Sequence, residues 1–200
     1  VRREERWLDI ARQGYDFLTA HGKSEDGTYY FALNRAGEAT MAPSNIFSEC
    51  FAAMGAAALF KATGEEKYRI EANSAMKKYI ARMDNPKGRW EKAMPAKPRR
   101  LSHGHFMMLA NLGVVMKDAL GTDEYDRDCE RAIDAVLSKF WNEEYQVLFE
   151  NVNPDGTFDL DSCEGRFINP GHGLESMWFV MNYAEKHNDP EMIAKAAKIV

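Results

Sequence analysis

Apolar residues recur every three to four positions along most of this chain, which is the pattern of amphipathic helices. Residues that favour helix ends support the limits of these segments: Gly64 and Gly121 stand where C-caps belong, and Thr122 and Asp189 stand where N-caps belong. The sequence therefore predicts an all-α protein with seven helices. The predicted helices are Arg3–Ala20, Asn45–Thr63, Glu65–Met83, Leu101–Leu120, Asp123–Trp141, Pro170–Lys186 and Pro190–Val200.

The predicted helices are of two kinds. The segments 47–60 and 106–116 are apolar on most sides, so we expect them to be buried all round. The segments that begin near Trp7, Tyr68 and Tyr125 have an aromatic residue followed by small residues three and four positions apart, as in helices that pack closely on their neighbours. Inner apolar helices that alternate with outer amphipathic ones predict a helical toroid.

Three long connections join an outer helix to the next inner helix: His21–Pro43, Asp84–Arg100 and Asn142–Asn169. Connections of this length in a compact domain are usually functional, so we expect them to gather at one rim and to wall a cleft. Strand-like residues followed by turn residues occur at 27–37 and 146–156, which predicts short β-hairpins in these rim loops.

Both ends of the chain have the helical pattern, and the toroid predicted from seven helices is incomplete. We therefore expect residues 1–200 to be a single domain that forms part of a longer barrel, with one N-terminal helix and further C-terminal helices outside the chain.

Composition narrows the function classes. The 200 residues carry a net charge of −5, and lysines and arginines are interspersed with acids, which argues against a nucleic-acid partner. No apolar run approaches the roughly 20 residues of a membrane span. Cys50, Cys129 and Cys163 lack metal-ligand spacing, so we expect no metal and no disulfide framework. A cytoplasmic protein that binds a small molecule fits these features.

The predicted helix that starts at Pro170 carries the most informative side chains. Asn169 is a suitable N-cap and Pro170 suits the first helical position, which puts His172 in the first turn and Glu175 one turn later on the same face. The helix dipole disfavours an imidazolium there, and a nearby carboxylate favours it and can orient the ring. His172 is therefore either a proton acceptor or a residue that caps and packs the helix end.

The run Asn169-Pro-Gly-His172-x-Leu-Glu175-x-x-Trp178-Phe resembles the N-acylglucosamine 2-epimerase family. The resemblance extends to 47–54, to the hairpin at 26–37 and to Leu148-x-Glu-Asn-Val152 with its following turn. It implies an (α/α)6 barrel, here incomplete. It also implies that His172 is one of two catalytic histidines, supported by Glu175 and Trp178 from the same helix.

The resemblance places the second histidine, and an arginine that meets the sugar, outside the chain; neither His103 nor His105 takes the second catalytic role. His105 corresponds to a substrate-contacting histidine of the isomerase branch, and we expect it to line the cavity. Arg166 is expected to bind either a sugar hydroxyl or the carboxylate of Glu175. Glu49 lies on an apolar helix, so it either faces the cavity or ties helices together.

The activity implied is interconversion of N-acetylglucosamine and N-acetylmannosamine, or of a related aldose, at C2. Such a reaction needs two proton carriers, one on each face of the sugar, and no cofactor. Aldose–ketose isomerisation and cellobiose or mannose 2-epimerisation are alternatives within the same superfamily. A non-catalytic binding protein is a third possibility, and a glycoside hydrolase is a fourth, which would need two carboxylates such as Glu49 and Glu175. The sequence leaves the oligomeric state open, a homodimer being one possibility, and the resemblance alone allows a nucleotide effector.

Overall fold

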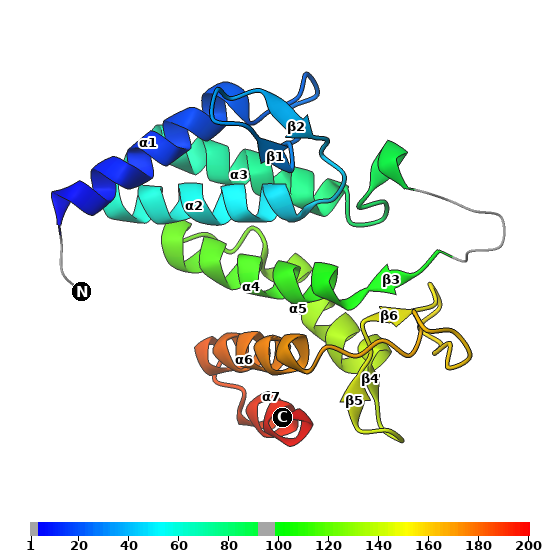
Figure 1. Ribbon diagram of the computed structural model, residues 1–200. Coiled ribbons are helices and arrows are strands. Elements are labelled where there is room, and N and C mark those ends of the chain that lie inside the picture. Colours follow the sequence, from blue (N-terminus) through cyan, green and yellow to red (C-terminus); the bar gives the residue numbers. More distant parts are fainter. Residues whose placement is uncertain (1–3, 92–98) are drawn as a thin grey trace. The chain divides into compact units, whose positions relative to one another are not determined.

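The computed structural model describes residues 4–91 and 99–200 of the chain (Figure 1). The expected start of the first helix at Arg3 and the middle of the connection Asp84–Arg100 lie outside the described residues. The chain divides into two compact units: one contains residues 1–91 and 115–122, and the other contains residues 92–114 and 123–200. The boundary between the units falls within α4 (His103–Leu120).

The first unit is a group of three helices, α1 (Glu5–His21), α2 (Phe47–Thr63) and α3 (Glu66–Ala81) (Figure 1). The α2 helix packs against α3 and also contacts α1. Both α2 and α3 have buried alanines, and small side chains on packed helices allow two helix axes to approach closely. A two-stranded antiparallel hairpin, β1 (Ala32–Leu33) with β2 (Ala39–Met41), and the 3₁₀ turn η1 (Gly88–Trp90) complete the unit.

The expectation that 47–60 is buried all round is wrong. The Phe51 side chain is 61% exposed, and Gly55 and Ala58 are exposed beside it. These three residues recur at the helical period, so they form one stripe along α2. The α2 helix packs against α1 and α3, and this stripe stays exposed in the described chain.

The second unit holds the start of α4 together with α5 (Asp126–Ala135), η2 (Val136–Phe140), α6 (Pro170–Lys186) and α7 (Pro190–Ile199). The α6 and α7 helices pack side by side (Figure 1). The expected helix Asp123–Trp141 is shorter at its start: α5 begins after its N-cap residue Tyr125, which makes no side-chain cap bond. Its last turn is a π-helix, η2.

Strands of the second unit connect segments that are far apart in sequence. The expected hairpin at 146–156 is wrong: its strand divides into β5 (Val147–Leu148), which pairs with β4 (Trp141–Asn142), and β6 (Asn151–Val152), which pairs with β3 (Leu101–Ser102). The turn does form, with the Gly156 N–H donating to the Asn153 carbonyl at 2.8 Å, but no strand follows it. The division leaves Phe149 and Glu150 between two ladders.

Several predicted helix limits are wrong by one or two residues: α2 begins at Phe47 and not Asn45, α3 ends at Ala81 and not Met83, and α4 begins at His103 because Leu101 and Ser102 form β3. The other predicted cap residues are confirmed. Gly64 and Gly121 adopt left-handed backbone conformations, with φ of 70° and 65°. The Asp189 side chain accepts the Met192 N–H, as an N-cap does. The α6 helix starts and ends where the sequence predicted. No described helix is long and apolar enough to cross a membrane.

Candidate active site

His172 lies in the first turn of α6, where local sequence fixes the backbone. The Asn169 side-chain oxygen accepts the N–H groups of Gly171 at 3.1 Å and His172 at 3.4 Å, and Pro170 occupies the first helical position. These contacts satisfy N–H groups that the start of a helix otherwise leaves unpaired. The His172 side chain is 39% exposed. One imidazole is thus held at the helix start with part of its surface accessible.

Glu150 is the carboxylate that contacts His172. Its Oε1 atom lies 2.9 Å from His172 Nδ1, and its side chain is only 9% exposed. The β5 strand brings this segment to α6, and the side chain of Leu148 lies against α6 at Gly173. The carboxylate that pairs with His172 therefore comes from a segment that packs against α6 and not from α6 itself.

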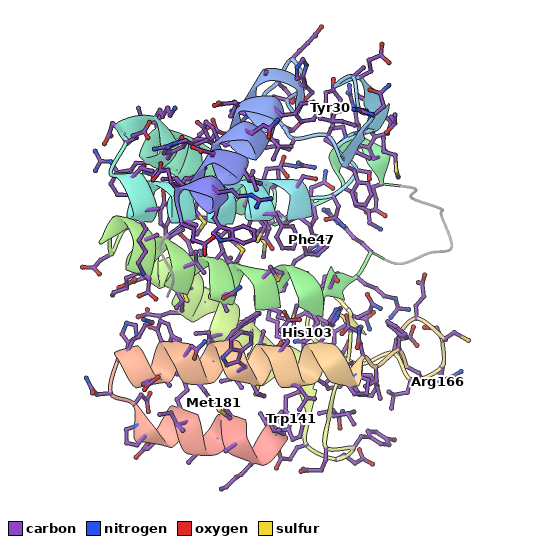
Figure 2. The ribbon with its side chains drawn as sticks, turned by 60° about the vertical axis from the view of Figure 1, so that its left-hand side comes forward. Tyr30, Phe47, His103, Trp141, Arg166 and Met181 are labelled. Atoms are coloured by element: carbon purple, nitrogen blue, oxygen red, sulfur yellow. The ribbon has the colours of Figure 1, made fainter. Side chains whose placement is uncertain are left out.

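A second histidine contacts the same carboxylate. His103 is the first residue of α4 and is completely buried, and its Nδ1 atom lies 3.4 Å from Glu150 Oε1. Its other ring nitrogen, Nε2, lies 2.8 Å from the hydroxyl of Ser176, one turn after His172 on α6. Figure 2 labels His103 where the start of α4 meets α6. Glu150 is therefore shared by a buried imidazole and a partly exposed one.

The electrostatics of Glu150 follow from these contacts. Burial raises the pKa of its carboxyl, but the hydrogen bonds and charges of His103 and His172 outweigh burial, so the pKa lies below its ordinary value. Glu150 is consequently a carboxylate at neutral pH, and it can only accept hydrogen bonds.

His103, Glu150 and His172 are also the one group within residues 4–91 and 99–200 whose ligand atoms are close enough to hold a metal ion, all within 4.8 Å of one another. Two imidazoles and a carboxylate form a ligand set that zinc accepts. Hydrogen bonds explain the same short distances without a metal ion, if the ring N–H groups of His103 and His172 both donate to Glu150 Oε1.

The expected pairing of Glu175 with His172 does not occur. Within the described residues Glu175 makes no hydrogen bond and no ion pair, and the carboxylate at His172 Nδ1 is that of Glu150. The expected contact between Arg166 and Glu175 is also absent: the guanidinium of Arg166 donates to the carbonyls of Leu160 at 2.9 Å and Asp161 at 3.2 Å. Figure 2 labels Arg166 in the loop before α6. A sugar contact by Arg166 stays a prediction.

Trp178 is 60% exposed and is not brought to His172. At 3.6 residues per turn, a spacing of six residues puts its side chain about 120° around α6 from His172. His105 is buried in the first turn of α4, at 7% exposure. Substrate contacts by these two residues stay predictions.

Glu49 belongs to the first unit and is completely buried there. Its Oε1 atom accepts the Arg82 guanidinium at 2.7 Å and the Tyr29 backbone N–H at 3.1 Å. Of the two roles left open by the sequence, the described contacts are those of a carboxylate that ties α2 to α3 and to the segment before β1.

A groove of about 610 Å³ lies elsewhere in the second unit, between α5, η2, α6 and α7. Neither His172 nor Glu150 lines it. We therefore assign the candidate active site from the side-chain cluster and not from the groove.

Reasoning from the sequence missed Glu150 and Ser176. A signal was present for Glu150, because it is a charged residue inside the strand-like run 146–152, where a buried charge is costly unless it is paired. Ser176 gave no comparable signal, since a serine within a helix is common.

Comparison with known proteins decides the family. The family model described as N-acylglucosamine 2-epimerase (GlcNAc 2-epimerase) matches residues 1–200. The chain belongs to the N-acylglucosamine 2-epimerase family. It is 32% identical over 192 residues to the mouse N-acylglucosamine 2-epimerase, covering 92% of this chain and 45% of the relative, and 30% identical over 200 residues to the human one, covering 96% and 46%. The chain thus spans about half the length of these curated relatives.

Solved structures confirm the expected fold class. Cellobiose 2-epimerase from Bacillus thermoamylovorans matches 98% of this chain and 54% of its own with a TM-score of 0.79 at 13% identity. A D-mannose isomerase matches 98% and 51% with a TM-score of 0.70 at 11% identity. A family 76 α-mannanase from Bacteroides thetaiotaomicron matches 98% and 54% with a TM-score of 0.70 at 12% identity. The chain has the helical-hairpin fold of (α/α)6 barrel enzymes, and this fold carries several chemistries.

Proposed function

We propose that the protein that contains this chain is a sugar 2-epimerase, and that it interconverts N-acetylglucosamine and N-acetylmannosamine. The observation that carries the proposal is the imidazole of His172 at the start of α6, partly exposed and held by a carboxylate, in a chain of the N-acylglucosamine 2-epimerase family. All the curated relatives that support this choice are themselves named N-acylglucosamine 2-epimerase.

The chemistry requires a base on one face of the open-chain sugar. His172 removes the C2 proton, the electron pair of the C2–H bond forms a C1–C2 double bond, and the carbonyl oxygen at C1 takes up negative charge. A second proton carrier on the opposite face returns a proton to C2 and inverts the centre. The second carrier is expected from the part of the relatives' length that this chain does not span, because His103 is completely buried with both ring nitrogens occupied.

The test incubates the intact protein separately with N-acetylmannosamine, mannose and cellobiose in deuterium oxide and follows products and C2 labelling by NMR. We expect N-acetylglucosamine with deuterium at C2 from the first sugar. A ketose product would reassign the protein to the aldose–ketose isomerases, and turnover of cellobiose alone to the cellobiose 2-epimerases. If the protein binds a sugar but exchanges the C2 proton of none of them, we would conclude that it is a binding protein and not an enzyme.

The variant His172→Ala removes the proposed base, and we expect it to abolish exchange of the C2 proton for deuterium. A rate of exchange equal to that of the wild type would refute the role of His172.

We further propose a cytoplasmic homodimer that acts on a free sugar without a cofactor, at neither a membrane nor a nucleic acid. The cysteines form no disulfide within the described residues, and two of the three are buried, which is usual for proteins of reducing compartments. Sedimentation of the purified protein tests the dimer, and activity with and without added ATP tests a nucleotide effector.

A further inference from the structure

The backbone of Glu150 is held by both segments that carry the histidines. Its carbonyl accepts the His103 N–H at 2.9 Å, and its own N–H donates to the Phe167 carbonyl at 2.9 Å, three residues before the start of α6. Glu150 also lies in the short gap between β5 and β6, so a strand pairing limits movement on each side of it. The position of the carboxylate is therefore fixed independently of its side-chain contacts.

The hydrogen bonds around this carboxylate determine where the protons are. Because an ionised carboxylate only accepts, the Nδ1 atoms of both His172 and His103 must carry hydrogen. The hydroxyl of Ser176 then donates to His103 Nε2, which has the free lone pair. Each of the three contacts has one donor and one acceptor, so the network is consistent without an imidazolium.

The ring of His103 also restricts the carboxylate. It is completely buried, and its centroid lies 5.4 Å from that of Phe140, so it has little room to turn. The bond to Ser176 fixes it from the other side. His103 thus keeps Glu150 directed at His172.

We propose that Glu150, supported by His103 and Ser176, is the positioning residue of the reaction: it fixes His172 as the Nδ1–H tautomer and leaves Nε2 to carry the substrate proton. This rests on the proposed 2-epimerase function. When the C2–H bond breaks, the proton passes to His172 Nε2 and the electron pair stays in the sugar as the C1–C2 double bond. The imidazolium that forms faces the Glu150 carboxylate, whose negative charge stabilises it.

Three titratable groups are related to His172 by contact or by position on its helix. Glu150 lies between β5 and β6, His103 is on α4 and contacts Glu150, and Glu175 is one turn along on α6. Of these three described groups, Glu150 alone makes a hydrogen bond with His172. Removal of this one charge is therefore the informative perturbation.

The first arm of the test needs no turnover. Long-range ¹H–¹⁵N correlation spectra of the intact, histidine-labelled protein at neutral pH report the tautomer of each ring. We expect the Nδ1–H form for both His172 and His103. The Nε2–H form at His172 would overturn the proposal, whether or not the protein proves to be an epimerase.

The second arm measures the C2 deuterium exchange rate against pH for Glu150→Gln, Glu150→Asp and a control, Glu185→Gln. We expect Glu150→Gln to lower kcat about 10²- to 10⁴-fold, the range in which a base loses its orienting carboxylate. The acid limb of the pH profile should move to lower pH, because the imidazolium loses the charge that favours it. Glu150→Asp should recover part of the rate and the wild-type acid limb.

Glu185 is an exposed carboxylate on the same helix, 13 residues after His172 and so about 20 Å along α6. Its variant should match the wild type in both rate and profile. A Glu150→Gln protein that is slower with an unchanged pH profile, or as fast as the wild type, would overturn the positioning role. If Glu150→Gln does not fold, Glu150→Asp tests the positioning role, because its side chain keeps the negative charge but is shorter by one methylene group.

Failure of the two proposals can be told apart. If the wild type exchanges no C2 proton in any sugar, the proposed function is wrong, and the spectra still decide the tautomer. If the wild type exchanges and the pH profile of Glu150→Gln is unchanged, the function stands and the role of Glu150 is wrong.

Discussion

Replacement of Glu49 by glutamine tests whether this buried carboxylate holds the first unit together or binds substrate. Glu49 Oε1 accepts two donors, the Arg82 guanidinium at 2.7 Å and the Tyr29 N–H at 3.1 Å. A glutamine can keep the bond to Tyr29 but loses the charge that pairs with Arg82. Removal of one member of a buried ion pair costs about 3–5 kcal/mol.

Two features of the structure adjust that figure. Arg82 also donates to the carbonyls of Pro43 at 3.1 Å and Pro86 at 3.0 Å, and its side chain is 18% exposed, so it is not left without partners. In the opposite direction, Glu49 Oε2 is buried and has no hydrogen-bond partner within the described residues, so an amide nitrogen there adds an unsatisfied donor. We expect Glu49→Gln to lower the free energy of unfolding by about 2–4 kcal/mol.

The assay is equilibrium urea unfolding of the intact protein, followed by circular dichroism. Glu25→Gln is the control, because Glu25 is an exposed carboxylate of the same unit and should change stability by less than about 0.5 kcal/mol. Adding Arg82→Met to Glu49→Gln should cost less than the sum of the two single changes, since the pair is then absent as a whole. A Glu49→Gln protein as stable as the wild type but with a raised KM would refute this reasoning and put Glu49 in contact with the sugar.

Four further outcomes follow from the structure. Asn169→Ala should lower the free energy of unfolding by about 1 kcal/mol, measured by urea unfolding, and Asn169→Asp should restore it, since either carboxamide or carboxylate caps α6. The pKa of Glu150 is lowered from its ordinary value of 4.5, so its contribution to stability is present above that value and lost as the pH falls through the lower folded-state pKa. The stability difference between wild type and Glu150→Gln, measured by urea unfolding at a series of pH values, should therefore shrink as the pH falls below 4.5. Iodoacetamide should label Cys163 in the native protein and spare Cys50 and Cys129, because Cys163 is exposed and the other two are buried. Burial also raises the pKa of the Cys50 thiol to about 12. Labelling of all three cysteines before unfolding, measured by mass spectrometry, would contradict the burial. Dialysis against EDTA should leave the C2 exchange rate unchanged, and recovery of a lost rate by added zinc would show that the two imidazoles and the carboxylate hold a metal.

Local signals explain what the sequence predicted well. An asparagine cap followed by proline marks the start of α6 in the sequence, and both ends of the helix lie where the sequence predicted. The glycines that end α2 and α4 act through their own backbone conformations. Such features depend on a few neighbouring residues, so no tertiary information is needed to find them.

Non-local pairing explains what was predicted wrongly. Glu175 was preferred as the partner of His172 because helical spacing is visible in the sequence, whereas Glu150 reaches His172 from 22 residues away. That approach depends on a strand that divides and pairs with two separate partners, and a strand's alternating pattern does not identify its partners. The start expected at Asp123 rested on Thr122 as the cap residue, whereas the regular helix α5 begins only after Tyr125.

The same divided strand has a consequence for the order of folding. Helical pairs such as α2 with α3 join neighbouring segments and can form early, because little chain entropy is lost in closing short loops. The cluster of His103, Glu150, His172 and Ser176 closes loops of 22, 47 and 73 residues. We therefore expect hydrogen-exchange protection of the His103 and Glu150 amides to appear after that of α2 and α3 during refolding, so that the reactive imidazole acquires its tautomer as one of the last events of folding.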